Sequence, residues 1–131
     1  MVEHLTPEVF YKTLKEMDRC LKTDGYLIVS APLIWDGFYN DLSHIRPYPP
    51  SVFKNYLCSK LPRPRTRDLI SNSYTVIEEV YRYFEVHPLQ LIQNINKNIF
   101  VRIYLFLQRK LSKVGLRHYE KTGYTIVLQK K

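Results

Sequence analysis

The sequence predicts a three-layer α/β fold in a single domain spanning residues 1–131. One observation is an amphipathic helix at about 7–22, and another is an apolar run at 26–31 between Asp24-Gly25 and Pro32. The third is the alternation of helical and strand patterns along the rest of the chain. A short apolar run between breakers is typical of a parallel strand covered on both faces. In open α/β sheets ligands bind at the carboxyl ends of such strands, so we expect the functional site there.

The helix at 7–22 is predicted by its start and by its apolar face. Thr6 can accept a hydrogen bond from the free amides of the first turn, and Pro7 suits the first helical position. The apolar residues then recur four, three and four positions apart, which places them on one side of a helix: Phe10, Leu14, Met17 and Leu21.

Four more elements are predicted after the strand at 26–31. A helix is expected at 50–60, a strand at 74–82, a helix at 88–113 and a final strand at 123–129. The 74–82 segment also fits a helical spacing, but its β-branched and aromatic residues favour a strand. The 88–113 helix is basic and amphipathic, so it suits either a core-covering role or a membrane surface or partner. We expect residues 88–115 to form a variable helical cap.

The charge composition limits the classes of partner. Lys and Arg outnumber Asp and Glu by 20 to 12, which gives a net charge of +8 and a basic protein. Such a charge favours anionic partners, either nucleic acid or lipid, although a solvated basic surface has the same composition. No apolar run approaches the length of a membrane span, and the N-terminus lacks the pattern of a signal peptide. With only Cys20 and Cys58 and no metal-like cysteine spacing, we expect a reduced, cytoplasmic protein.

Several stretches in the first half of the chain carry a family resemblance. They are Val2-Glu3-His4-Leu5, the segment Arg19-Cys20-Leu21-Lys22-Thr23-Asp24-Gly25, the strand Tyr26–Pro32, and His44-Ile45-Arg46-Pro47-Tyr48. Together with the final strand they resemble the second half of a class I S-adenosylmethionine-dependent methyltransferase. The resemblance implies a partial Rossmann-like sheet in which 26–31 is the fifth strand and the last strand is antiparallel. Residues 62–122 resemble no family.

The cofactor-binding part of that fold is not in this sequence. The family's Gly-rich turn is absent, because the chain has four glycines and no Gly-x-Gly. The resemblance therefore implies a truncated fold that lacks the N-terminal cofactor-binding strands. It would bind S-adenosylmethionine only if another segment or chain completed it. Either Met1 is an internal methionine of a longer gene, or the chain is a stand-alone half; both alternatives remain open.

The resemblance also implies a metal site. Some members of the family bind a divalent cation through a Glu-x-x-Glu-His motif and a distal His, and Glu3, His4 and His44 match the last three of these ligands. Such an ion would lower the pKa of an acceptor hydroxyl. Metal-independent members carry a similar Glu-His-Leu, in which the His lines the acceptor pocket or packs a loop.

The loop that follows the strand is rich in aromatic residues. We expect it to surround a planar methyl acceptor, with these candidates: Trp35, Phe38, Tyr39, His44 and Tyr48. The alternative for the same residues is packing against the edge of the sheet. No catalytic residue is assigned.

Two functions follow from the sequence. The first is the acceptor-side half of a methyltransferase, and the second is a non-catalytic basic module that binds nucleic acid, a membrane surface or a protein partner. In either case the strand at 26–31 would lack its neighbour on one edge. We expect a homodimer or a partner chain to cover the edge of residues 26–31.

Overall fold

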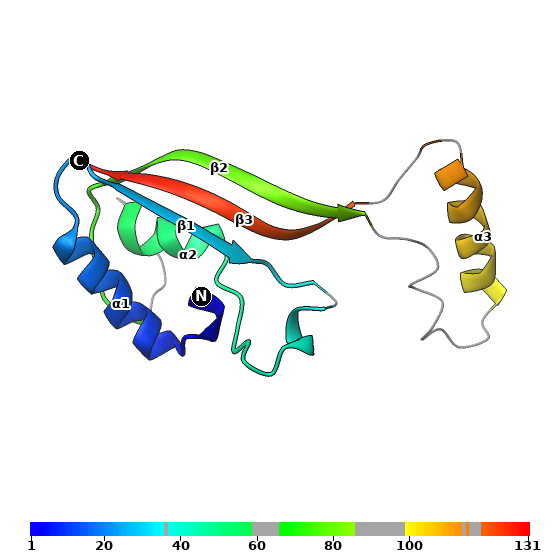
Figure 1. Ribbon diagram of the computed structural model, residues 1–131, viewed down its shortest axis with the longest axis horizontal. Coiled ribbons are helices and arrows are strands. Elements are labelled where there is room, and N and C mark those ends of the chain that lie inside the picture. The colour runs from blue at the N-terminus through cyan, green and yellow to red at the C-terminus, as the bar shows by residue number, and fades with distance from the viewer. Residues whose placement is uncertain (36, 59–65, 86–98, 114, 116–118) are drawn as a thin grey trace. The chain divides into compact units, whose positions relative to one another are not determined.

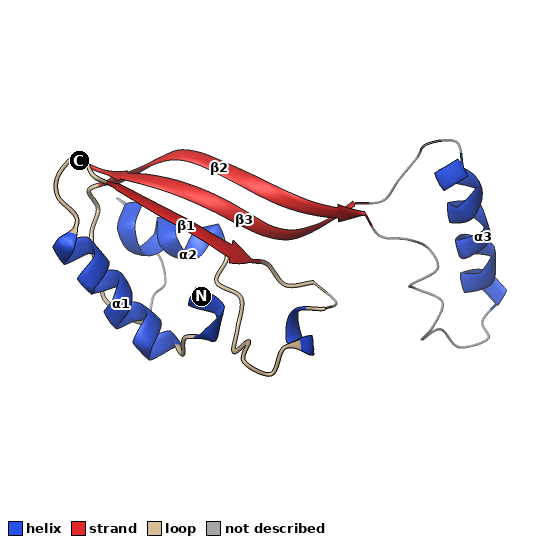
Figure 2. Ribbon diagram, in the orientation of Figure 1, coloured by secondary structure: helices blue, strands red, loops and turns tan. Residues whose placement is uncertain are grey.

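The computed structural model describes residues 1–35, 37–58, 66–85, 99–113, 115 and 119–131. They belong to two compact units, one of Met1–Arg82 with Lys121–Lys131 and one of Tyr83–Glu120. The two units are described separately. The elements in chain order are η1 (Val2–His4), α1 (Pro7–Cys20), β1 (Tyr26–Pro32), η2 (Phe38–Asn40), α2 (Pro50–Phe53), the π-helical turn η3 (Lys54–Cys58), β2 (Tyr74–Glu85), α3 (Ile99–Lys113) and β3 (Tyr119–Lys130) (Figures 1 and 2).

Helix α1 forms where the sequence predicts it. The Thr6 hydroxyl accepts a hydrogen bond from the Val9 amide at 3.4 Å, and Pro7 occupies the first turn. Phe10 and Leu14 are buried, and Met17 and Leu21 pack against the same core. The helix ends at Cys20 because Leu21 already has an extended backbone.

The described sheet has three strands in the order β1-β3-β2. The final strand β3 runs antiparallel to β1, in a register from Tyr26 opposite Gln129 to Pro32 opposite Gly123. This pairing aligns the inward side chains of the two strands. The fully buried ones all belong to β3, and they are Tyr124, Ile126 and Leu128.

The expectation that 26–31 is a parallel strand covered on both faces is wrong. Burial alternates along β1, with Val29 and Ala31 buried and Tyr26 and Ile28 exposed by 55% and 65%. Among the described residues of the first unit, α1 and α2 cover one face of the sheet (Figure 1), so two layers stand where three were predicted. The prediction of a strand covered on both faces was wrong because apolar residues occupy the exposed face of β1 as well as the buried face.

The remaining predicted elements of the first unit are present. The helix expected at 50–60 is α2 followed by η3, and its inward residues Phe53 and Leu57 are fully buried. The strand expected at 74–82 is β2, which continues to Glu85.

The second unit contains the segment predicted as a helical cap. Helix α3 matches the predicted helix over residues 99–113, whereas 88–98 lie outside the described residues. Its described apolar side chains are at least half exposed, as in Phe100 and Phe106 at 76% and 59%. None of the described helices combines the length and the apolar character needed to cross a membrane.

Candidate metal centre at the carboxyl end of strand β1

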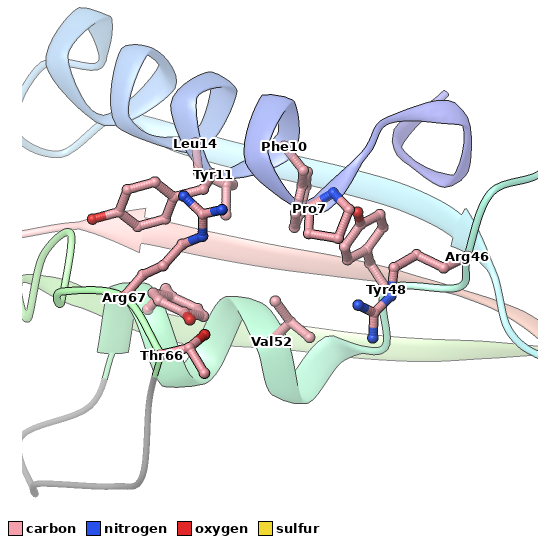
Figure 3. Close-up of a pocket in the computed structure, with 10 residues that line it drawn as sticks. Pro7, Phe10, Tyr11, Leu14, Arg46, Tyr48, Val52, Thr66 and Arg67 are labelled. Atoms are coloured by element: carbon pink, nitrogen blue, oxygen red, sulfur yellow. The ribbon is translucent and has the colours of Figure 1, made fainter.

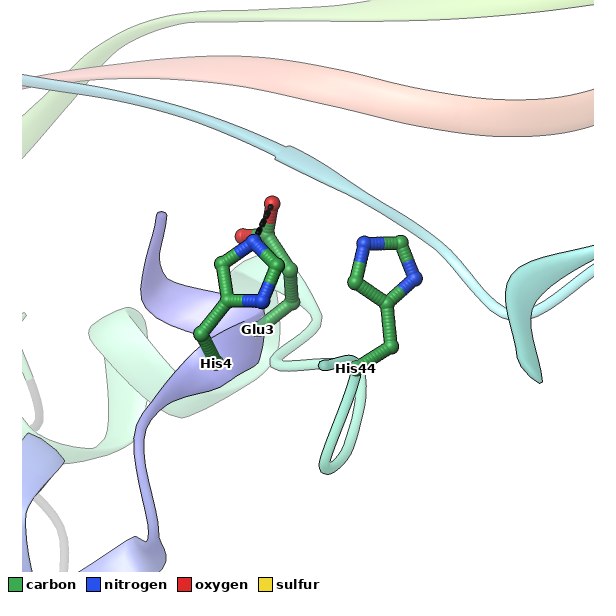
Figure 4. A group of neighbouring side chains, drawn as sticks. All are labelled: Glu3, His4 and His44. Carbon is green, nitrogen blue, oxygen red and sulfur yellow. Dashed lines mark ion pairs between the residues drawn. The ribbon is translucent and has the colours of Figure 1, made fainter. Parts of the chain in front are cut away.

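Glu3, His4 and His44 converge beside the carboxyl end of β1 (Figure 4). Each offers one ligand atom, and these atoms all lie within 4.8 Å of one another. His4 Nε2 lies 3.5 Å from Glu3 Oε1. Two segments more than thirty residues apart in the chain thus bring three metal-ligating side chains together, as the sequence resemblance implies.

Backbone hydrogen bonds join these two segments. The Glu3 carbonyl accepts from the Ile45 amide at 2.9 Å and from the Arg46 amide at 3.3 Å. The short helix η1 is closed by its own bond from the Leu5 amide to the Val2 carbonyl at 3.0 Å. The main chain therefore holds Glu3 and His4 against the loop that carries His44.

Both histidine rings are fixed in the same tautomer. His4 Nδ1 lies 3.0 Å from the Ser43 carbonyl oxygen, and His44 Nδ1 lies 2.6 Å from the Phe38 carbonyl oxygen. A carbonyl oxygen only accepts, so each Nδ1 must carry the proton and donate it. The neutral ring then has its lone pair on Nε2, the atom left to coordinate. Metal-ligating histidines usually have such a backbone or carboxylate acceptor behind them.

A turn at Asp41 positions the acceptor for His4. The Asp41 carboxylate accepts from the Ser43 amide at 2.8 Å and from the Ser43 hydroxyl at 2.6 Å. These two bonds hold the pKa of the Asp41 carboxyl below its usual value, since they stabilise the ionised form. The same turn includes a bond from the His44 amide to the Asp41 carbonyl at 3.1 Å. Asp41 is thus a shaping residue of the loop.

The Glu3 carboxylate is buried and only partly satisfied. Its side chain is 10% exposed, and Oε1 lies 2.6 Å from the Met1 ammonium. Oε2 is buried without a hydrogen-bond partner among the described residues. Burial acts to raise the pKa of Glu3, but hydrogen bonds from the Met1 ammonium and from its own amide, together with the charge of Met1, lower the pKa overall. The carboxyl is therefore ionised at neutral pH.

These three residues fit a divalent ion of borderline softness. Two imidazoles and one carboxylate, with further positions open, form the ligand set of many catalytic zinc and non-haem iron sites. An ion with bonds of about 2.1 Å needs its ligands about 3 to 3.4 Å apart, so no pair of ligand atoms has to close by more than about 1.5 to 2 Å.

The aromatic residues expected to form one wall around an acceptor lie in different surroundings. Phe38 is fully buried, and its ring lies 4.7 Å from that of His44. Tyr39 is 59% exposed, and its ring meets Phe38 edge-on at 4.9 Å. Trp35 closes over Gly37, where an added Cβ would lie 2.2 Å from the indole.

Tyr48 lies apart from this group, in the core. Its ring packs 4.0 Å from that of Phe10, and its hydroxyl donates to the Leu5 carbonyl at 2.8 Å. Burial raises the pKa of the Tyr48 hydroxyl. Of the five residues predicted to surround the methyl acceptor, Phe38, Tyr39 and His44 form one cluster. Trp35 packs against its own loop, and Tyr48 lies in the core.

Sequence reasoning missed the groups that orient the two histidines. The hydrogen-bond acceptors are the backbone carbonyls of Ser43 and Phe38. Every residue has a backbone carbonyl, so the sequence does not indicate which ones bind a histidine. The spacing Asp41-x-Ser43 is the one available signal, because aspartate often accepts from the amide two residues ahead.

No protein-family model, curated protein or solved structure matches this chain. The family resemblance therefore remains a prediction from the motifs themselves.

The fixed tautomers give a direct spectroscopic prediction. At pH 8, above the ordinary histidine pKa of about 6.5, long-range ¹H–¹⁵N correlation spectra should show His4 and His44 protonated at Nδ1. Free histidine in water instead favours the Nε2-protonated form. Asp41→Ala should disturb His4, because it removes the turn that presents the Ser43 carbonyl, and leave His44 protonated at Nδ1. Protonation of both rings at Nε2 in the unaltered chain would contradict the described geometry.

Proposed function

We propose that this chain is the acceptor-side half of an S-adenosylmethionine-dependent methyltransferase-like fold, and that Glu3, His4 and His44 bind a divalent cation next to the methyl acceptor. The observation that carries the proposal is the convergence of these three side chains beside the end of β1, where each histidine directs its Nδ1 to a backbone carbonyl and the Glu3 carboxylate is buried.

The arrangement of the strands supports the methyltransferase part of the proposal. The sequence resemblance implies a final antiparallel strand beside the strand that carries the acceptor loop, and β3 is antiparallel to β1. The loop that leaves β1 also contributes His44 to the cluster, as the resemblance requires. The strand order supports the assignment of the fold. The assignment of the reaction depends on the residues of the site.

The chemistry of the site suits an oxygen acceptor. A bound divalent cation would act as a Lewis acid that lowers the pKa of a hydroxyl group of the acceptor. Ionised Glu3 supplies a negative charge that offsets part of the charge of the cation, and the two imidazoles add neutral ligands. Tyr39, which is 59% exposed on the same loop, is available to contact a planar acceptor. The chain's own contribution is to hold and orient the acceptor, and the methyl donor would bind to cofactor-binding strands supplied by another segment or chain.

The second candidate is a non-catalytic basic module that binds an anionic partner. The net charge of +8 favours it. Cation binding distinguishes the two candidates, because the basic module needs no cation at Glu3.

Zinc binding tests the metal site. Calorimetry should show one Zn²⁺ per chain in a tag-free protein with the exposed Cys20 changed to Ser, so that the thiol cannot compete. Glu3→Gln and His44→Gln should each weaken this binding by more than about 100-fold, because loss of a ligand costs more than loss of an outer contact. Binding should also weaken as the pH falls, since the imidazoles must be neutral to coordinate.

Glu16→Gln is the matched control for Glu3→Gln, because Glu16 is an exposed carboxylate on α1 that pairs with Arg19 at 2.8 Å. It should leave zinc affinity unchanged. Mg²⁺ should bind far more weakly than Zn²⁺, because magnesium prefers oxygen ligands. Equal zinc affinity in the Glu3→Gln, His44→Gln and unaltered chains would refute the site.

Cofactor binding tests the half-fold. The 131-residue chain alone should show no measurable heat of binding with S-adenosylmethionine, with or without zinc. The reason is that the Gly-rich turn and the acidic ribose-binding residue of the family are not in its sequence. Micromolar binding by this chain would mean that it carries a complete cofactor site of another design.

The open edge of β1 leads to a proposal about assembly. In the described sheet β1 pairs with β3 on one side, and no described strand lies on its other side (Figure 2). We expect a homodimer through residues 26–31, with twice the monomer mass of 15.7 kDa in light scattering. Ile28→Lys should shift the protein toward monomer, because a lysine on an edge strand discourages pairing, whereas Val9→Lys on α1 should not. A monodisperse monomer of the unaltered chain would count against this interface.

A further inference from the structure

A groove lies between α1 and α2, apart from the Glu3–His4–His44 cluster (Figure 3). Its volume is about 210 Å³. The floor is apolar, with half-buried Val52 beside the nearly buried Phe10 and Leu14. Because ligand sites for drug-sized molecules occupy about 300–1,000 Å³, this groove suits one flat ring system.

An arginine stands at each end of the groove (Figure 3). The Arg46 guanidinium lies 5.5 Å from the centre of the Tyr48 ring, and the Arg67 guanidinium lies 5.3 Å from the centre of the Tyr11 ring. Stacking on aromatic rings holds each cation in place without neutralising it. Both side chains therefore present a preorganised positive charge at the rim.

Neither guanidinium forms an ion pair with a carboxylate of the described residues. Glu8 is an acidic group close enough to interact with Arg67 through space, and its carboxylate pairs with Lys12 at 3.0 Å. The bond from Lys12 is the main cause that lowers the pKa of Glu8, and the charge of Arg67 adds to it. Guanidinium groups with this exposure and geometry suit phosphate oxygens.

We propose that the groove binds single-stranded nucleic acid, with one base on the apolar floor and the two adjoining phosphates on Arg46 and Arg67. The order of the groups in the groove, cation, apolar floor, cation, is complementary to the order phosphate, base, phosphate along a strand. Single-strand binding proteins combine a basic track for the backbone with apolar or aromatic surfaces for the bases. A duplex does not fit this pattern, because its bases are stacked inside and cannot reach the floor.

Other anionic ligands match the groove less well. A lipid headgroup or an acidic peptide would satisfy one or both arginines but would leave the apolar floor without a flat partner. The net charge of +8 adds a long-range attraction for a polyanion. This inference does not depend on the metal site, and it goes beyond the proposed function because it assigns a ligand class to a second site.

The test measures the fluorescence anisotropy of labelled ten-nucleotide oligo(dT) and oligo(U) with the full chain. Arg46→Gln/Arg67→Gln should weaken binding at least tenfold for whichever strand binds more tightly. It should also lower the slope of log affinity against log salt by about 1.4, the value for two single-strand phosphates. The stronger of the two probes identifies the strand as DNA or RNA.

The control variant Lys22→Gln/Lys131→Gln removes the same charge from two exposed lysines that do not line the groove. It should change the affinity less than about threefold. Equal losses in both double variants would overturn the proposal, because they would indicate attraction by net charge alone.

A ten-unit abasic strand tests the role of the floor. It should bind at least tenfold more weakly than oligo(dT), because it has no base to place between the two arginines; equal affinity would overturn the proposal. Vesicles of phosphatidylserine and phosphatidylcholine test the competing ligand. A loss of vesicle binding in Arg46→Gln/Arg67→Gln with unchanged oligonucleotide binding would assign the groove to lipid and refute the inference. Glu3→Gln should leave oligonucleotide affinity within about threefold, which separates this site from the metal centre.

Discussion

The antiparallel pairing of β1 with β3 is the constraint on which the rest of the first unit depends. It places Tyr124 of β3 in the core, fully buried, opposite Ala31. The Tyr124 hydroxyl donates to the Tyr48 carbonyl, and the Tyr48 hydroxyl donates to the Leu5 carbonyl. Two buried tyrosines thus connect the sheet, the end of the loop that follows β1 and the segment that follows His4. Burial raises the pKa of Tyr124, so its hydroxyl stays protonated and remains a donor.

This connection gives the candidate metal centre its rigidity. The loop from 33 to 49 has little regular structure, yet both of its ends are anchored. One end continues β1, with the Leu33 amide bonded to the Thr122 carbonyl at 2.9 Å. The other end holds the Glu3 carbonyl through Ile45 and Arg46. A site built on an anchored loop holds its ligands near their binding positions, and less conformational entropy is lost when a ligand binds.

Much of the fold was predictable because periodicity and capping are local properties. Helix α1, the strand at Tyr26–Pro32, the strand from Tyr74 and the final strand all match the sequence predictions. The exposure of Tyr26 and Ile28 was not predictable, since burial depends on what lies across the sheet, which no local pattern records. The grouping of Glu3, His4 and His44 followed from motifs, whereas the carbonyls that orient the two rings became visible only in the structure. Tyr48 shows the same limit, because its sequence position suggested the acceptor loop but its hydrogen bonds place it in the core.

The central claim is that Glu3, His4 and His44 together bind one divalent ion. The most direct measurement is anomalous diffraction at the zinc absorption edge from crystals grown with zinc chloride. The account predicts a single strong peak about 2.1 Å from His4 Nε2, from His44 Nε2 and from a Glu3 carboxylate oxygen. A map with no peak at these residues, or with zinc bound only elsewhere on the chain, would contradict it.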